Sequence, residues 1–132
     1  MNTPEPTPAP DLSLRDLAQF AEGQARRLAA NFAANFGLDP TDCGSRAYFA
    51  LAQTVKLGEE AGELQAEVLG ALELQRREKA GRFSRETLGG ELADVMVCVA
   101  LLADTFGVDL AWAVASKIEQ LEARNRQAEI TG

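Results

Sequence analysis

Apolar residues recur at the spacing of an α-helix along most of the chain, and no segment shows the apolar–polar alternation of a strand. The first helical stretch covers residues 13–37, with Asp16 in its first turn and Gly37 as its C-terminal stop. The second covers about residues 45–78, and its length predicts a bend or break near Gly70. The first half of the chain therefore predicts two amphipathic helices.

The third stretch is apolar on nearly every face between residues 92 and 103, which is typical of a helix in the core. Ser84 is its expected N-cap. The pair Gly89 and Gly90 can delay the regular part of this helix to Glu91.

Gly107 is expected to end the third helix, and Asp109 to cap a fourth that runs to about residue 127. The fold class is therefore all-α, an antiparallel bundle of four main helices. Four short helices cannot cover a helix that is apolar all round, whereas a second copy of the chain can. Obligate homo-oligomer interfaces resemble a domain core cut in half, so we expect homo-oligomerisation to complete the bundle.

Prolines at positions 4, 6, 8 and 10 predict a disordered tail over residues 1–10, which leaves one small helical domain over residues 11–132. The net charge of −7 argues against a nucleic-acid partner, because such proteins usually carry a basic surface. The longest apolar run, residues 95–103, is too short to span a membrane, and the start of the chain has no signal-peptide pattern. Cys43 and Cys98 are expected to be reduced thiols of a cytoplasmic protein.

Two carboxylate clusters change this picture: Glu59, Glu60 and Glu63 in the second helix, and Glu91 and Asp94 in the third. Residues three or four apart share a helix face, so side-by-side helices would bring up to five carboxylates together. At an effective dielectric of about 20, two like charges roughly 6 Å apart repel by about 3 kcal/mol. The helical phase makes Glu60 the most buried of its three and Glu59 the least, and it places Asp94 in an apolar setting where a lone charge is costly.

Such clusters also occur as solvated faces or, for Glu91 and Asp94, as a buried pair with arginine. Taken together they favour a bound cation. Oxygen ligands without any histidine indicate Mg²⁺, with Mn²⁺ as an alternative.

The chain resembles the MazG-like, all-α nucleoside triphosphate pyrophosphohydrolases over roughly residues 50–125. The matching segments are Lys56-Leu57-Gly58-Glu59-Glu60-Ala61-Gly62-Glu63-Leu64, Glu91-Leu92-Ala93-Asp94-Val95-Met96, Phe106-Gly107-Val108-Asp109-Leu110 and Ser116-Lys117-Ile118. The resemblance implies a Mg²⁺-dependent enzyme that splits a nucleoside triphosphate into monophosphate and pyrophosphate. It also implies a homodimer or a tetramer built as a dimer of dimers.

Matching the motif residue by residue assigns Glu60, Glu63, Glu91 and Asp94 to the metal. Glu59, the most exposed of its cluster, becomes the residue that orients and deprotonates the attacking water. Its alternative role is to ligate a second ion.

The resemblance also assigns the substrate phosphates to Lys117 and Arg124, which are two turns apart and share a helix face. The asparagine often found four residues after the lysine is absent, because Leu121 stands there. A solvated amphipathic helix is the alternative for this pair.

An aromatic side chain could stack on the base and an amide could read its edge, which makes Asn31, Phe32, Asn35 and Phe36 candidates, although aromatics at helical spacing are more often core. A second basic group is better explained as a solvated loop: Arg76, Arg77, Lys79, Arg82 and Arg85. The identity of the base and sugar stays open.

Two other functions fit the same pattern: an enzyme similar to phosphoribosyl-ATP pyrophosphohydrolase, and a non-catalytic metal-binding helical bundle. A di-iron bundle is excluded because its Glu-x-x-His elements need histidine, which the chain lacks.

Overall fold

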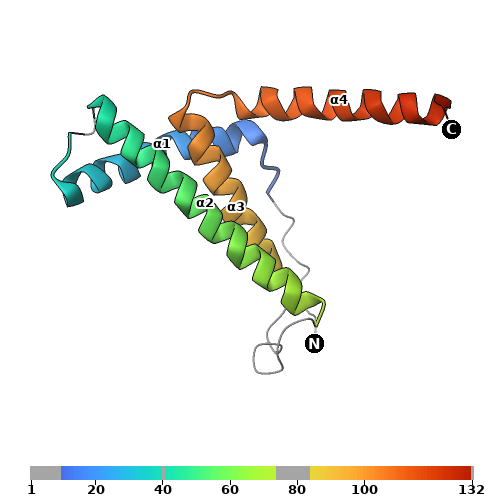
Figure 1. Ribbon diagram of the computed structural model, residues 1–132, viewed down its shortest axis with the longest axis horizontal. Helices are drawn as coiled ribbons and strands as arrows, with labels where there is room; N and C mark the ends of the chain where they lie inside the picture. Colours follow the sequence, from blue (N-terminus) through green and yellow to red (C-terminus); the bar gives the residue numbers. More distant parts are fainter. Residues whose placement is uncertain (1–9, 40, 74–83, 132) are drawn as a thin grey trace.

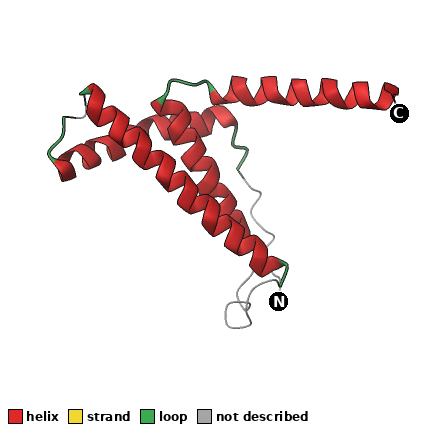
Figure 2. Cartoon of the chain, viewed as in Figure 1, coloured by secondary structure: helices red, strands yellow, loops and turns green. Residues whose placement is uncertain are grey.

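The computed structural model describes residues 10–39, 41–73 and 84–131. These ranges contain four helices and no strand, so the all-α prediction is confirmed for them (Figures 1 and 2). In chain order the helices are α1 (Leu14–Phe36), α2 (Cys43–Ala71), α3 (Arg85–Thr105) and α4 (Leu110–Thr131). The predicted tail lies outside the described residues except for Pro10, as do four of the five residues of the second basic group.

Local signals set both ends of α1 where the sequence predicts them. The Asp16 N–H donates to Ser13 Oγ (3.2 Å), and the Asp16 carboxylate accepts from the Ser13 N–H (2.9 Å), which forms a capping box. These hydrogen bonds lower the pKa of Asp16. At the other end Gly37 adopts φ 63°, a left-handed conformation that suits glycine, and the Leu38 N–H reaches back to the Ala33 carbonyl (2.7 Å).

Helix α2 begins earlier than expected and ends earlier than expected. Asp42 is its N-cap and accepts from the Ser45 N–H (3.2 Å), so the helix includes Cys43. It ends at Ala71, one residue past the predicted break at Gly70, and Glu73 follows with φ 55°. The prediction of helix to residue 78 is therefore wrong for residues 72 and 73, and its remaining part lies outside the described residues.

Helix α3 begins at Arg85, directly after its predicted cap Ser84, which accepts from the Thr87 N–H (3.0 Å). Gly89 and Gly90 lie inside the helix and do not delay it. A glycine costs a helix only about 1 kcal/mol, which the cap and the packing of α3 can offset. Gly107, with φ 65°, ends the helix as predicted.

Three helices pack together and leave α4 outside. The core lies between α1 and α3, and α2 runs along α3 (Figure 1). The buried core residues are Leu17, Ala21, Ala25, Ala100 and Leu101. Helix α4 turns through 111° relative to α3 and projects away from the other three (Figure 1). The four-helix bundle is thus not formed within one chain.

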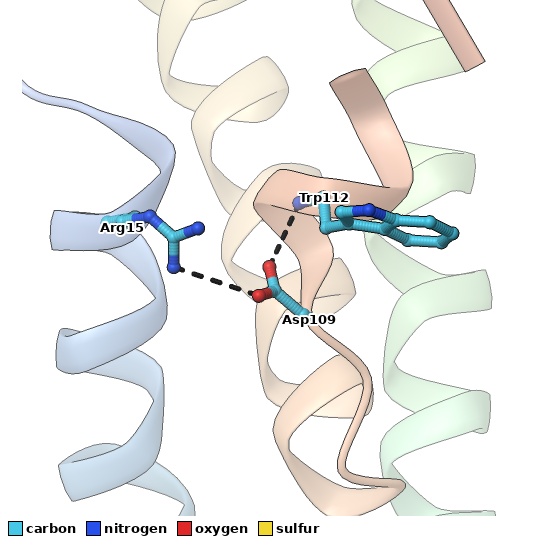
Figure 3. A network of polar contacts seen from close by, with 3 residues as sticks. All are labelled: Arg15, Asp109 and Trp112. Atoms are coloured by element: carbon cyan, nitrogen blue, oxygen red, sulfur yellow. Dashed lines mark hydrogen bonds and ion pairs between the residues drawn. The ribbon is translucent and has the colours of Figure 1, made fainter. Parts of the chain in front are cut away.

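Asp109 fixes the start of α4, as the sequence predicts. Its carboxylate accepts from the Trp112 N–H (2.9 Å) and lies 3.7 Å from the Arg15 guanidinium of α1 (Figure 3). Beyond this anchor, α4 has no buried residue and continues to Thr131, past the expected residue 127. Trp112 is 68% exposed.

The expectation that α3 lies in the core is wrong for the single chain. It buries only Cys98, Ala100 and Leu101, whereas Leu92, Met96 and Val99 are exposed, Met96 to 50%. Helices α1 and α2 cover two sides of α3, and no described helix covers its remaining apolar face. Within the described ranges, no single helix is long and apolar enough to cross a membrane, although α3 and α4 together meet that test as a bent pair.

Candidate metal centre

Three predicted ligands come together where α2 lies beside α3. Glu60 and Glu63 extend from α2 and Glu91 from α3, and one carboxylate oxygen of each lies within 4.8 Å of the others. We call these three residues the carboxylate cluster. The sequence predicted this convergence from two i, i+3 patterns and the assumption that the helices are neighbours.

Burial within the cluster is uneven. Glu60 is buried, with 8% of its surface exposed, while Glu63 is exposed and Glu91 is half-buried. Glu59, one residue before Glu60, has a side chain that is 56% exposed. The prediction from helical phase that Glu60 is the most buried of Glu59, Glu60 and Glu63 is confirmed.

Glu91 combines a buried oxygen that lacks a partner in the described ranges with a raised pKa. Its Oε2 atom is buried and has no hydrogen-bond partner among the described residues. Burial and, after it, the neighbouring charges of Glu63, Asp94 and Glu60 raise the pKa of Glu91 above its ordinary value. A buried carboxylate oxygen without a donor is rare in proteins and requires an explanation.

Asp94 does not lie in the apolar setting that the sequence predicts. It is exposed and is not part of the carboxylate cluster, although its charge acts on Glu91. It lies on α3, whose apolar surface is only partly covered in one chain, so the surroundings that were expected to bury Asp94 are absent on that side.

Two further residues contact the site, and the sequence analysis assigned neither of them a role there. Lys56 Nζ lies 2.7 Å from a Glu60 oxygen and 3.3 Å from a Glu59 oxygen, and these contacts raise the pKa of Lys56. Glu67 accepts from Thr87 Oγ1 (3.1 Å), which links α2 to α3, and its charge contributes to the raised pKa of Glu91. Helical spacing could have found both, because Lys56 precedes Glu60 by four residues and Glu67 follows Glu63 by four.

Cys98 lies near the cluster but is a poor ligand. Burial and then the charge of Glu60 raise the pKa of its thiol, which keeps the sulfur protonated, whereas a metal ligand must be the thiolate. Cys98 and the exposed Cys43 are both free cysteines, and their reduced state stays a prediction.

The predicted phosphate residues are separated from the cluster. Lys117 and Arg124 are exposed on α4, and Lys117 Nζ donates to Gln120 Oε1 (3.4 Å) on the same helix. Because α4 projects away from α2 and α3, one chain does not bring these cations to the carboxylate cluster (Figure 1).

The predicted base-pocket residues lie at the junction of α1 and α2. Asn31, Asn35 and Phe36 are exposed, while the half-buried Phe32 packs its ring against Phe36 (centroids 5.0 Å apart) and Phe49 (6.0 Å). The cavity beside Phe32 measures about 20 Å³, enough for a water molecule and not for a base. At 1.5 Å per residue, Phe49 lies about 16 Å along α2 from Glu60. The base-pocket assignment stays a prediction.

The chain matches no family model, no curated protein and no solved structure in comparisons with known proteins. Three carboxylates with oxygens within 4.8 Å of one another suit a hard divalent cation and offer no soft ligand. One of the three, Glu91, has a buried oxygen without a donor among the described residues.

Proposed function

We propose that this chain is a Mg²⁺-dependent nucleoside triphosphate pyrophosphohydrolase, which releases nucleoside monophosphate and pyrophosphate. The observation that carries the proposal is the carboxylate cluster, in which Glu91 has a buried oxygen with no donor in the part of the chain that the structure describes. Its residues belong to the same pattern on which the resemblance to the MazG-like enzymes rests.

The residues present fit a divalent metal ion. Glu60, Glu63 and Glu91 would hold Mg²⁺, or Mn²⁺ in its place, and Asp94 on the exposed rim of α3 would be a further ligand. When bound, the ion would neutralise phosphate charge that an acidic protein otherwise repels.

Glu59 is the proposed general base. Its carboxylate is exposed beside the buried Glu60, so solvent water can reach it. In the proposed reaction, a water oxygen bonds to the α-phosphorus of the substrate. The bond between this phosphorus and the α–β bridging oxygen breaks, and pyrophosphate leaves with that oxygen. Glu59 takes the proton that the water gives up.

The proposal includes a second copy of the chain, as a homodimer or a dimer of dimers. One chain leaves an apolar hollow of about 310 Å³ between α1 and α3, lined by Leu12, Leu17, Phe20, Ala93, Met96 and Val97 together with Asp16. An uncovered apolar face on α3 and an α4 without buried residues support the same conclusion, because helices in proteins gain most of their stability from packing. A partner would also supply cations that one chain keeps away from its own cluster.

The test is to incubate purified protein with Mg²⁺ and a panel of ribo- and deoxynucleoside triphosphates plus phosphoribosyl-ATP, and to separate the products by chromatography. Nucleoside monophosphate with pyrophosphate supports the proposal, and turnover of phosphoribosyl-ATP alone selects the related enzyme. Metal binding without any turnover selects a non-catalytic helical bundle. Nucleoside triphosphates occur in the cytoplasm, so the proposed substrate agrees with the expected cytoplasmic location. The proposed reaction requires neither a nucleic acid nor a membrane.

A further inference from the structure

Lys56 neutralises only one side of the site. Its ammonium group contacts Glu60 at 2.7 Å and Glu59 at 3.3 Å, both on its own helix. On the opposite side, from α3, Glu91 has a buried oxygen with no donor within the described residues. Among the described residues, the ion pairs at the cluster therefore involve only carboxylates of α2, and the carboxylate of Glu91 on α3 is left without a cationic partner.

Glu60 belongs to two arrangements at once. It is the main partner of Lys56, and it is also a member of the carboxylate cluster within 4.8 Å of Glu63 and Glu91. Its side chain is only 11% exposed, and the ammonium group 2.7 Å from one of its oxygens would repel a divalent ion that approaches the same carboxylate. Lys56 is 48% exposed, and a long lysine stem can swing its charged end into water.

We propose that Lys56 is a built-in counter-cation that holds Glu60 and must release it when a divalent ion binds the carboxylate cluster. Lys56 thereby sets the metal concentration at which the site fills. This is a positioning role exerted through Glu60, and it rests on the metal site of the proposed function. The competing explanation is an ordinary i, i+4 ion pair on a helix surface, which would leave metal affinity unchanged.

The experiment measures Mn²⁺ binding to the full chain by calorimetry, for the wild type, Lys56→Met, Lys56→Arg and Arg27→Met. Lys56→Met keeps an unbranched side chain, shorter by the terminal nitrogen, and removes its charge. Arg27→Met removes one positive charge from an exposed position on α1, which controls for the change in net charge. Helix content, followed by circular dichroism, confirms that each variant is folded.

We expect Lys56→Met to bind Mn²⁺ at least about tenfold more tightly than the wild type, while Lys56→Arg and Arg27→Met stay within about threefold of it. If the wild type binds Mn²⁺ and Lys56→Met binds no more tightly, the role of Lys56 is refuted and the metal site stands. If Arg27→Met tightens binding equally, the effect is one of net charge and the inference fails. If neither the wild type nor Lys56→Met binds Mn²⁺, the proposed metal site itself is refuted. If Lys56→Met binds Mn²⁺ and the wild type does not, Lys56 competes with the metal ion for Glu60 strongly enough to keep the site empty.

Discussion

Adding Mg²⁺ to metal-free protein should raise its temperature of unfolding. The folded chain holds three carboxylate oxygens within 4.8 Å of one another, whereas the unfolded chain separates Glu60 from Glu91 by a long flexible segment. A divalent ion therefore binds the folded state far better than the unfolded state, and it also removes the repulsion among the three charges. Stability should rise with metal concentration, as linkage requires.

The size of the effect follows from that linkage. At a metal concentration one hundred times the Kd, the gain in unfolding free energy is about 2.7 kcal/mol. For a chain of this length, each kcal/mol shifts the unfolding temperature by roughly 3–6 °C, so the total shift should be about 8–16 °C. Such a shift is easily resolved by circular dichroism at 222 nm.

Two controls separate binding from general salt effects. Sodium chloride at the same ionic strength should give a much smaller shift, because it only screens the charges. Glu63→Gln should lose most of the Mg²⁺-dependent shift, whereas Glu119→Gln, which removes the same charge from exposed α4, should retain it. An equal shift in sodium chloride, or a full shift in Glu63→Gln, would refute the assignment of the cluster as a metal site.

Three further predictions concern Glu59, Glu91 and Met96. Glu59→Gln should lower kcat by about 10²–10⁴-fold, the usual contribution of a general base, and leave nucleotide affinity in Mg²⁺ nearly unchanged by calorimetry; equal losses of rate and affinity would make Glu59 a ligand instead. Because the folded state raises the pKa of Glu91 above 4.5, the folded protein binds more protons than the unfolded protein in the window that begins near that value, so the stability contribution of Glu91 falls as the pH rises through the window. Urea unfolding of metal-free protein should show this fall in the wild type and a smaller one in Glu91→Gln; identical pH profiles would remove Glu91 as the strained group. Met96→Glu should reduce or abolish self-association in sedimentation velocity, because it places a charge in the apolar hollow on α3, and an unchanged oligomer would put the interface elsewhere.

The helix ends that the sequence predicted correctly depend on contacts within a few residues. Ser13, Ser84 and Asp109 each accept from a backbone N–H three residues ahead, and Gly37 and Gly107 adopt left-handed conformations just after a helix. Such signals act before tertiary structure forms, so they can be read from the chain alone. The convergence of the cluster was predictable for a related reason: once α2 and α3 are neighbours, helical phase decides which acids meet.

The burial of Asp94 and the direction of α4 could not be predicted from the sequence. Whether Asp94 is buried depends on what covers α3, and an apolar surface in the sequence does not say which segment, or which copy of the chain, does so. Helix α4 leaves α3 after the turn at Gly107, and Asp109 at its start contacts Arg15 of α1. Periodicity within a helix contains no information about the angle at which that helix leaves its neighbour.

The distribution of charge around the cluster also gives the proposed metal binding an order. Glu60 is already compensated by Lys56, and Glu67 by a hydrogen bond from Thr87, so both have partners to lose. Glu91 has a buried oxygen without a donor in the described parts of the chain, and it gains most from a cation. Within the proposed function, an incoming ion should therefore engage Glu91 and the exposed Glu63 first and take Glu60 only as Lys56 withdraws. Calorimetry with Mn²⁺ should then show a larger loss of affinity on removing Glu91 than on removing Glu60, and this difference should shrink in a protein that lacks Lys56.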